Sequence, residues 1–138
     1  MVVTRKEWAA AARLCVGTPY SHAGRLVGVG LDCAGVVVAT AMLCGLRFED
    51  RMDYSLHNDN FALFSGTAES VARLYGGKLE NAYFAAFDLP LSPLHIAVVT
   101  PERTLIHVHY DRLVVEEPIP SGWRSRVLGL WTLHGAKN

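Results

Sequence analysis

The sequence lacks an excess of charge of either sign, and it lacks any long hydrophobic run. Lysine and arginine together number 13, aspartate and glutamate also number 13, and the formal net charge is zero. Nucleic-acid binding needs clustered positive charge that follows a phosphate backbone, so the composition predicts no nucleic-acid partner. No apolar stretch approaches the roughly 18–20 residues that a membrane-spanning helix requires, which predicts no membrane insertion.

Cysteine is scarce, and its spacing does not suit disulfides. The chain has three cysteines, Cys15, Cys33 and Cys44, and no Cys-x-x-Cys pair. On one helix Cys33 and Cys44 would lie about 16 Å apart along the axis, whereas a disulfide needs Cα atoms within about 7 Å. We therefore expect free thiols in a reducing compartment.

The first residues of the sequence also lack the pattern expected of a secretion signal. Charged residues follow the first apolar ones, and the segment from Trp8 to Leu14 has a short helical pattern that carries Arg13. We expect the chain to be cytoplasmic when it is made and to depend on other proteins for any transport out of the cell.

What the sequence does have is the content of a globular domain. Its 138 residues are 51% hydrophobic and 19% charged, which suits a single domain over residues 1–138. Helical patterns precede strand patterns, and this order predicts an α+β fold in which N-terminal helices pack on a C-terminal antiparallel sheet. We expect helices over 4–16, 33–44 and 67–75, an irregular excursion over 46–64, and strands over 81–87, 94–100, 105–110, 113–116 and 127–133.

Local signals support the helix boundaries. Thr4 and Glu7 have the spacing of a capping box, and Thr67 is suited to cap the third helix. The segment 33–44 is ambiguous, because Val36-Val37-Val38 favours a strand. Its length and the following Gly45 favour a helix, and its apolar character on all sides predicts burial.

One thiol stands in a setting that suits a nucleophile. Cys33 lies between Asp32 and Ala34, with glycines nearby on both sides, at the start of the expected second helix. The amide end of a helix lowers the pKa of a thiol, especially beside a histidine. The glycines would let a substrate backbone approach, and the helix amides could hold an oxyanion. The alternative interpretation is a small buried hydrophobic residue.

A nucleophilic thiol needs a base, and three histidines in the strand half are candidates: His95, His107 and His109. The pattern around them predicts a hairpin that turns over residues 101–103. If Thr100 pairs near Thr104, His95 lies opposite His109 and diagonal to His107, with all three rings on one face. One ring could then take the thiol proton while a second orients it. A register slip of one residue would break this arrangement.

A metal site is the rival interpretation of these histidines. His107-x-His109 on a strand can present two imidazoles to one ion, with His95 or Asp111 as a third ligand. The other histidines are expected at the surface or outside the site: His22, His57 and His134. Cys15 and Cys44 are expected in the core. The carboxylates of Asp53, Asp59, Glu116 and Glu117 form no obvious acid–base pair. Glu116 and Glu117 are expected to be solvated at the end of a strand.

The motifs around Cys33 resemble those of the NlpC-type cysteine peptidases, which are papain-like cell-wall enzymes of bacteria and phages. The matching strings are Gly17-Thr-Pro-Tyr20, a glycine-rich loop, and Gly30-Leu-Asp-Cys-Ala-Gly35. HIAVV and LIHVHY supply His95 and His107 at the family's spacing of about a dozen residues. The closer resemblance is to the phage-tail branch, which shares these strings and ends in a Trp-Arg stretch like Trp123-Arg124.

The resemblance implies a papain-like fold and a role for each matching residue. Cys33 would be the nucleophile, His95 the general base, and His107 the residue that orients His95. The residues that would line the substrate site are Tyr20, Asp32 and Ala34, with Asp32 holding the free amine of a stem peptide. The implied reaction hydrolyses peptidoglycan stem peptides, usually between γ-D-glutamate and a diamino acid, through a thioester and with no metal or cofactor.

The chain departs from the family pattern in two places. Ala34 replaces the usual serine, which bears on the choice of substrate rather than on the thiol chemistry. The stretch AAFDLPLSPLH stands where a glycine-aspartate pair usually precedes the catalytic histidine. Two alternatives stay open: a structural tail-assembly protein of the same fold with little activity, and an acyltransferase in which an amine or alcohol replaces water. The expected partners are peptidoglycan peptides and other phage tail proteins, with delivery in a virion tail or to the periplasm.

Overall fold

The computed structural model of the protein describes residues 2–50 and 61–136. Its helices in those ranges are α1 (Arg5–Arg13), α2 (Cys33–Leu43) and α3 (Phe61–Ala68), with two short 3-10 helices, η1 (Leu79–Asn81) and η2 (Trp123–Arg126). The strands are β1 (Arg25–Leu26), β2 (Gly30–Leu31), β3 (Ala72–Leu74), β4 (Phe84–Leu89), β5 (Ser92–Val99), β6 (Thr104–His107), β7 (Val115–Pro118) and β8 (Val127–Leu133). No helix in the described ranges is long and apolar enough to cross a membrane.

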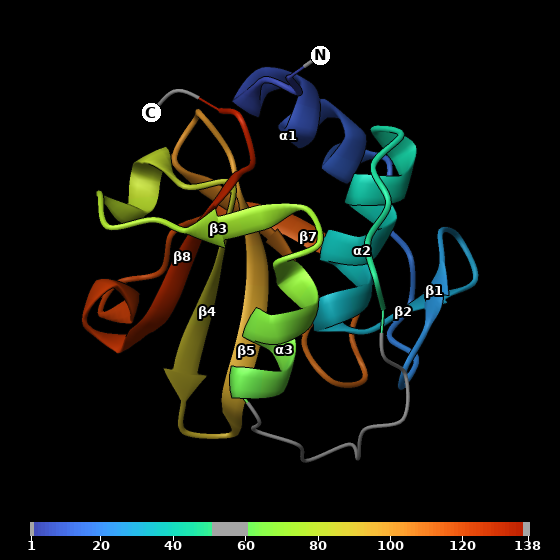
Figure 1. Ribbon diagram of the computed structural model, residues 1–138. Helices are drawn as coiled ribbons and strands as arrows, with labels where there is room; N and C mark the ends of the chain where they lie inside the picture. Colours follow the sequence, from blue (N-terminus) through green and yellow to red (C-terminus); the bar gives the residue numbers. More distant parts are fainter. Residues whose placement is uncertain (1, 51–60, 137–138) are drawn as a thin grey trace.

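Six of the strands form one antiparallel sheet. Their order is β3-β8-β4-β5-β6-β7, and every neighbouring pair runs antiparallel (Figure 1). β1 and β2 form a separate small hairpin beside α2. The predicted α+β class, with early helices packed on a later antiparallel sheet, is confirmed.

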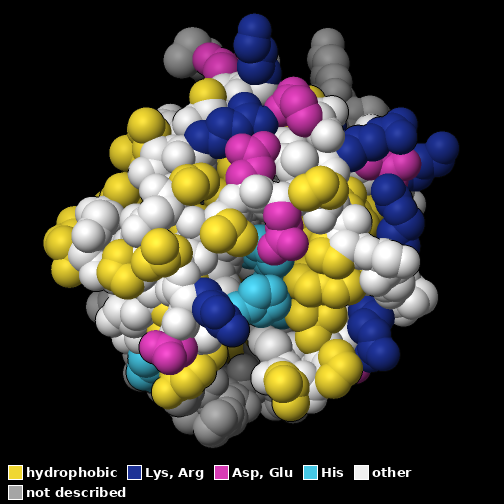
Figure 2. All heavy atoms as spheres, turned by 180° about the vertical axis from the view of Figure 1, so that it is seen from behind, with side chains coloured by type: hydrophobic (Ala, Val, Ile, Leu, Met, Phe, Trp, Pro, Cys, Tyr) yellow, Lys and Arg dark blue, Asp and Glu magenta, His cyan; other side chains and the backbone are white. Residues whose placement is uncertain are grey.

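Each face of the sheet has its own cover. α1 and α2 pack against each other and against β5 on one face (Figure 1). On the other face, Trp123 of η2 covers a second apolar cluster that includes Phe87 and Leu105. Figure 2 views the molecule from behind and shows histidine side chains near the middle of its surface, bordered by hydrophobic, acidic and basic side chains. Successive side chains of β5 therefore pack into the apolar clusters on opposite faces of the sheet, because strand side chains alternate between faces.

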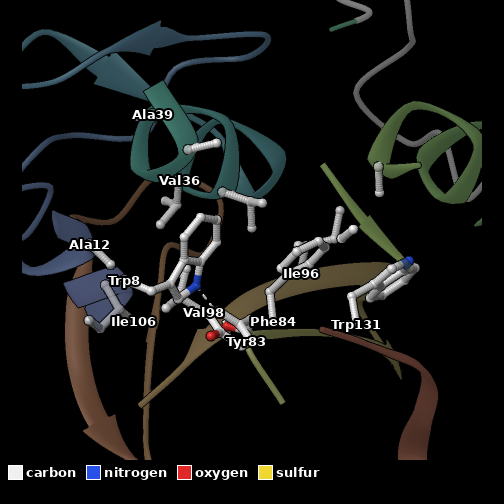
Figure 3. Close-up of a cluster of buried hydrophobic side chains, with 14 of the residues drawn as sticks. Trp8, Ala12, Val36, Ala39, Tyr83, Phe84, Ile96, Val98, Ile106 and Trp131 are labelled. Atoms are coloured by element: carbon white, nitrogen blue, oxygen red, sulfur yellow. Dashed lines mark hydrogen bonds between the residues drawn. The ribbon is translucent and has the colours of Figure 1, made fainter. Parts of the chain in front are cut away.

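The core between helices and sheet is built on aromatic side chains. Trp8 of α1 is fully buried, and its Nε1 donates a hydrogen bond to the carbonyl oxygen of Tyr83 at 2.9 Å (Figure 3). The Phe84 and Trp131 rings stack at 5.2 Å in the same cluster. The pairing of a polar indole nitrogen with a carbonyl lets this large ring be buried without an unsatisfied donor.

The capping signals at the first two helices are confirmed. The Thr4 hydroxyl accepts from the Glu7 amide at 3.1 Å, and the Glu7 carboxylate accepts from the Thr4 amide at 2.9 Å. α1 ends at Arg13, three residues before the expected Val16. α2 spans Cys33–Leu43, and Gly45 follows it with a φ of +77°, as expected for a residue that ends a helix.

The region after α2 corrects the sequence prediction. The expected helix over 67–75 is wrong: α3 occupies Phe61–Ala68, and Ala72–Leu74 is a strand. Thr67 is not a cap, because its hydroxyl donates back to the carbonyl oxygen of Phe64 within the helix at 2.9 Å. The helix includes residues 61–64 of the expected irregular excursion, where Phe64 packs edge-on against Trp131 at 5.3 Å.

Candidate active site

Cys33 is the first residue of α2 and lies against the start of β5. Its side chain is half-buried, and Sγ is 3.9 Å from the carbonyl oxygen of Leu94. The backbone N–H groups of Ala34 and Ile96 also lie close enough to lower the pKa of the thiol. Leu94 and Ile96 are the residues on either side of His95, so the fold places the thiol beside the backbone of the predicted base.

The resting thiol is neutral, which corrects the expectation of a lowered pKa. Burial, followed by the charge of Asp32, raises the pKa of Cys33 to about 12, against the smaller opposing effect of the neighbouring amides. Among the described residues, no hydrogen bond joins Sγ to an imidazole nitrogen. Catalytic hydrogen bonds are often long in ligand-free sites and shorten when substrate binds. Any nucleophilic role therefore requires a base that removes the proton during attack.

Asp32 shapes the start of α2 from a buried position. Its Oδ1 accepts from the Gly35 amide at 2.7 Å, which is the N-cap contact of the helix, and from Arg25 at 2.8 Å. Its Oδ2 accepts from the Ala23 amide at 3.0 Å. Arg25 in turn binds the Asp50 carboxylate at 2.6 Å. The predicted substrate contact of Asp32 would therefore use a carboxylate that already holds the helix and the glycine-rich loop.

Gly35, two residues after Cys33, packs closely against the glycine-rich loop of this chain. A Cβ at Gly35 would lie 2.2 Å from the carbonyl oxygen of Gly24. Only glycine lets the first turn of α2 pack this closely on the loop. The close approach that the sequence suggested is real, but its partner is the loop.

The three predicted histidines meet, as the hairpin register required. β5 and β6 pair with Val98 opposite Ile106, and the Thr100 amide donates to the Thr104 carbonyl oxygen at 3.0 Å. The His95 and His109 rings stack with centroids 4.5 Å apart and planes 10° apart. The His95 Nε2 and His107 Nδ1 atoms are 2.7 Å apart, so these two rings share a hydrogen bond.

The histidine cluster is desolvated. His95 and His107 are buried, and the Trp123 ring lies edge-on to both at 5.5 Å. Burial, followed by the neighbouring histidines, holds the pKa of His95 well below its ordinary value of 6.5. Burial also lowers the pKa of His107, although Glu117 partly opposes it. Both rings are therefore neutral at pH 7, and a neutral imidazole can accept a proton.

Glu117 is a site residue that the sequence analysis missed. Its Oε2 is 2.7 Å from His107 Nε2, so the prediction that Glu116 and Glu117 only solvate a strand end is wrong. Glu116 is also engaged: it binds Arg13 at 2.9 Å and accepts from the Thr104 hydroxyl at 2.6 Å. The pairing of β7 with β6 brings Glu117 to His107, and an alternating pattern could have indicated their shared face.

The geometry favours acid–base chemistry over metal binding. The ligand atoms of His95, His107 and His109 all lie within 4.8 Å of one another. However, the lone pair of an imidazole nitrogen lies in the ring plane, and the planes of His95 and His109 are almost parallel. One ion cannot lie in two stacked planes at the Zn–N distance of about 2.0 Å. A three-histidine site would thus need ring rotation, and Asp111 lies exposed in the following turn.

A cavity of about 820 Å³ adjoins both halves of the candidate site. Cys33, His95 and His109 line it, together with the predicted substrate residues Tyr20, Asp32 and Ala34. Burial, then Asp32, raises the pKa of Tyr20 to about 12, so its hydroxyl keeps its proton at neutral pH. Hydrophobic side chains form much of the remaining wall, among them Val38, Phe48, Leu63, Phe64, Leu91 and Leu94.

The remaining predicted residues lie apart from the hydrogen-bonded histidines. His22 is exposed at the cavity wall, and the exposed His134 binds the carbonyl oxygen of Glu69 at 2.7 Å. All three cysteines are free thiols: Cys15 is buried in the core, as expected, and Cys44 is only partly buried. Asp53, His57 and Asp59 lie outside the described residues.

Comparison with solved structures identifies the fold. RipD from Mycobacterium tuberculosis, described as a non-catalytic NlpC/p60 domain protein adapted to peptidoglycan binding, is 16% identical, with a TM-score of 0.60. The match covers 93% of this chain and 95% of RipD. The chain has an NlpC/p60 fold. The P60 domain of antigen MAP1272c from M. avium paratuberculosis shares this NlpC/p60 fold at 14% identity and a TM-score of 0.54, covering 91% of this chain and 94% of that one.

No protein-family model and no curated protein matches the sequence. The NlpC/p60 fold by itself does not establish catalysis, since RipD is described as non-catalytic. Activity therefore depends on the side chains that this protein places at the site.

Proposed function

We propose that the protein is a cysteine peptidase or amidase that hydrolyses peptidoglycan stem peptides. The observation that carries the proposal is that Cys33 and His95 both line one cavity. The His107 ring, behind His95, is hydrogen-bonded to it at 2.7 Å. The proposal takes residues 1–138 as one domain and the γ-D-glutamyl–diamino acid bond as the target. It also includes a role in a phage or prophage tail, which accords with the motif resemblance.

In the first half of the reaction, Cys33 forms a thioester with the substrate. His95 Nδ1, the nitrogen not bonded to His107, takes the thiol proton as Sγ attacks the substrate carbonyl carbon. The oxyanion is held by backbone amides at the start of α2, where Asp32 already occupies the amide of Gly35. The C–N bond then breaks, and the protonated His95 gives its proton to the leaving amine.

In the second half, water hydrolyses the thioester. His95 takes a proton from water as its oxygen attacks the acyl carbon, and the C–S bond breaks with return of that proton to sulfur. His107 holds the His95 ring throughout, so that one nitrogen stays directed away from the pair. The thiol proton leaves on the amine product, a proton from water replaces it on sulfur, and the water oxygen stays on the acid product. The enzyme is thus restored without an oxidant, a metal or a cofactor in the balance.

The substrate residues shape recognition at one end of the cavity. The protonated Tyr20 hydroxyl can donate a hydrogen bond to a peptide carbonyl. An amine bound by Asp32 would share the carboxylate with Arg25, which is 2.8 Å away. Ala34 offers no hydroxyl where the family usually has one, so recognition of the amine depends on these neighbours.

A binding role without cleavage is the second candidate. The raised pKa of Cys33 favours it, because a neutral buried thiol is a weak nucleophile until its proton is removed. Such a protein would bind stem peptides in the same cavity and release them unchanged.

The test compares two cysteine variants on purified peptidoglycan peptides. We expect Cys33→Ala to abolish cleavage while the fold, followed by circular dichroism, stays intact. Cys44→Ala is the matched control, because Cys44 caps the other end of α2 and should leave cleavage unchanged. Cleavage that persists in Cys33→Ala contradicts the proposal. A wild-type protein that binds every stem peptide tested but cuts none supports the binding role instead.

A further inference from the structure

We propose that Glu117 is a positioning residue that fixes which nitrogen of His95 carries the proton. The inference rests on the proposed function for its effect on cleavage, but its structural part can be measured without any substrate. Glu117 lies on β7, outside the predicted catalytic set, and acts on His95 through His107.

The sheet register brings Glu117 to His107. β6 and β7 pair with Leu105 opposite Glu117 and His107 opposite Val115. Residues 105 and 107 share a face of the sheet, so Glu117 lies diagonally across from His107 on that face. Its Oε2 is 2.7 Å from His107 Nε2, which is a short contact for a charge-assisted hydrogen bond.

The chemistry of the carboxylate sets the direction of the whole chain of hydrogen bonds. An ionised carboxylate only accepts, so His107 Nε2 must carry a hydrogen and donate it. A neutral imidazole has one N–H, which leaves His107 Nδ1 as an acceptor. His95 Nε2, 2.7 Å away, must then donate to that acceptor. The lone pair of His95 is thereby placed on Nδ1, the nitrogen that acts as the base in the proposed function.

Reversal of the chain would disable the base. If residue 117 donated to His107 Nε2, His107 would carry its hydrogen on Nδ1 and donate it to His95 Nε2. His95 would then hold its own hydrogen on Nδ1 and could not accept another while neutral. The exposure of the Glu117 side chain, 41% against 0% for His107, makes this end of the chain open to substitution without disturbing the core.

The neighbouring Glu116 provides a matched control. It lies on the same strand with the same charge, but its contacts are Arg13 and the Thr104 hydroxyl rather than a histidine. A charge change at residue 116 alters the local electrostatic field and the strand, but it leaves the Glu117 carboxylate as the hydrogen-bond partner of His107 Nε2.

The test is a series at residue 117: Glu117→Gln, Glu117→Ala and Glu117→Lys, with Glu116→Gln and Glu116→Lys as controls. We expect Glu117→Gln, which can still accept through Oε1, to rescue most of the activity that Glu117→Ala loses. The loss in Glu117→Ala should be about tenfold in kcat/KM, as for removal of a group that orients a catalytic histidine. Glu117→Lys, which can only donate, should lose about 100-fold or more, the scale of a missing general base.

Long-range proton–nitrogen NMR of the imidazole rings gives the direct readout. The wild type should show hydrogens on Nε2 of both His95 and His107, and Glu117→Lys should move both to Nδ1. The residue 116 controls should keep the wild-type pattern. Hydrogens on Nδ1 in the wild type, or no change in Glu117→Lys, overturn the inference, as do equal losses in all three residue 117 variants. If the wild type cleaves nothing, the proposed function fails while the NMR result still decides the role of Glu117.

Discussion

Two chains of polar contacts lead to the cavity, and they end in different ways. The first runs from Asp50 through Arg25 to Asp32, and it ends on the backbone amides of Gly35 and Ala23. The side chains are two carboxylates and one guanidinium, and in each contact an N–H group donates to a carboxylate oxygen. The hydrogen-bonding groups in this first chain of contacts are therefore paired with other groups of the protein.

The second chain runs from Glu117 through His107 to His95. Beyond its carboxylate end it consists of neutral rings, because burial keeps the pKa values of both histidines low. Its last member lines the cavity with one ring nitrogen outside the chain of hydrogen bonds. This chain ends at the space where a substrate would lie.

The difference separates a structural network from a reactive one. Charged groups in buried pairs are expensive to separate, so the Arg25–Asp32 pair holds the start of α2 in place. Neutral imidazoles can gain or lose a proton within one hydrogen-bonded chain, so the His95–His107 pair can transfer one. Substitutions in the first chain should therefore mainly change stability, and substitutions in the second should mainly change activity.

The largest expected effect is on catalysis at the open end of the second chain. His95→Ala should lower kcat/KM for a stem peptide by about 100-fold or more, because the substitution removes the proposed general base. His109→Ala removes a ring that stacks on His95 without a hydrogen bond to it, so its loss should be smaller. Steady-state kinetics on both variants measures the difference. A large loss in His109→Ala with little change in His95→Ala would mean that His109, and not His95, is the base.

The next effect is on stability in the first chain. Asp32→Ala leaves Arg25 without its buried partner and removes the cap of α2, so the free energy of unfolding should fall by roughly 3 kcal/mol. Asp32→Asn keeps a cap acceptor and should lose less. Glu117→Ala, at a partly exposed carboxylate, should lose less than about 1 kcal/mol. Urea denaturation compares the three variants. A greater loss of stability in Glu117→Ala than in Asp32→Ala would contradict the proposed division between a structural and a reactive chain of contacts.

The smallest effect is the change that one substitution in the second chain of contacts makes in the pH dependence of stability. The pKa values of His95 and His107 are lower in the folded protein than the ordinary 6.5, so the unfolded chain binds more protons below that pH. Stability is therefore fully present above pH 6.5 and falls as the pH drops, by up to about 1.4 kcal/mol per pH unit for each group. Urea denaturation between pH 7 and 5 should show a smaller slope in His95→Asn. An equal slope in that variant would mean that His95 is not desolvated.

The sequence predicted the parts of the site that depend on local rules. The placement of Cys33 at a helix start was predicted from the length of segment 33–44 and from Gly45 after it. The meeting of His95 with His107 was predicted from strand alternation around a short turn. Both involve residues close in the chain or joined by one tight hairpin. For the same reason, the capping box at Thr4 could be predicted from four residues.

The parts that the sequence did not predict depend on distant packing. α3 forms at Phe61–Ala68, where its aromatic side chains contact Trp131, a residue some 70 positions along. Glu117 was assigned to solvent because its contact with His107 requires the register between β6 and β7, which are joined by a longer connection. The pKa of the Cys33 thiol was predicted to fall because the sequence indicates the helix amides that lower it. The burial that raises this pKa depends on the fold.

The most direct test of the account is to trap the acyl-enzyme. An ester analogue of a stem peptide has a leaving group that needs no proton from His95, so acylation should outrun hydrolysis of the thioester. Mass spectrometry of the acid-quenched reaction should then show the acyl fragment attached to Cys33, and to neither Cys15 nor Cys44. Turnover of the analogue with no adduct on Cys33, continuing unchanged in Cys33→Ala, would contradict the account.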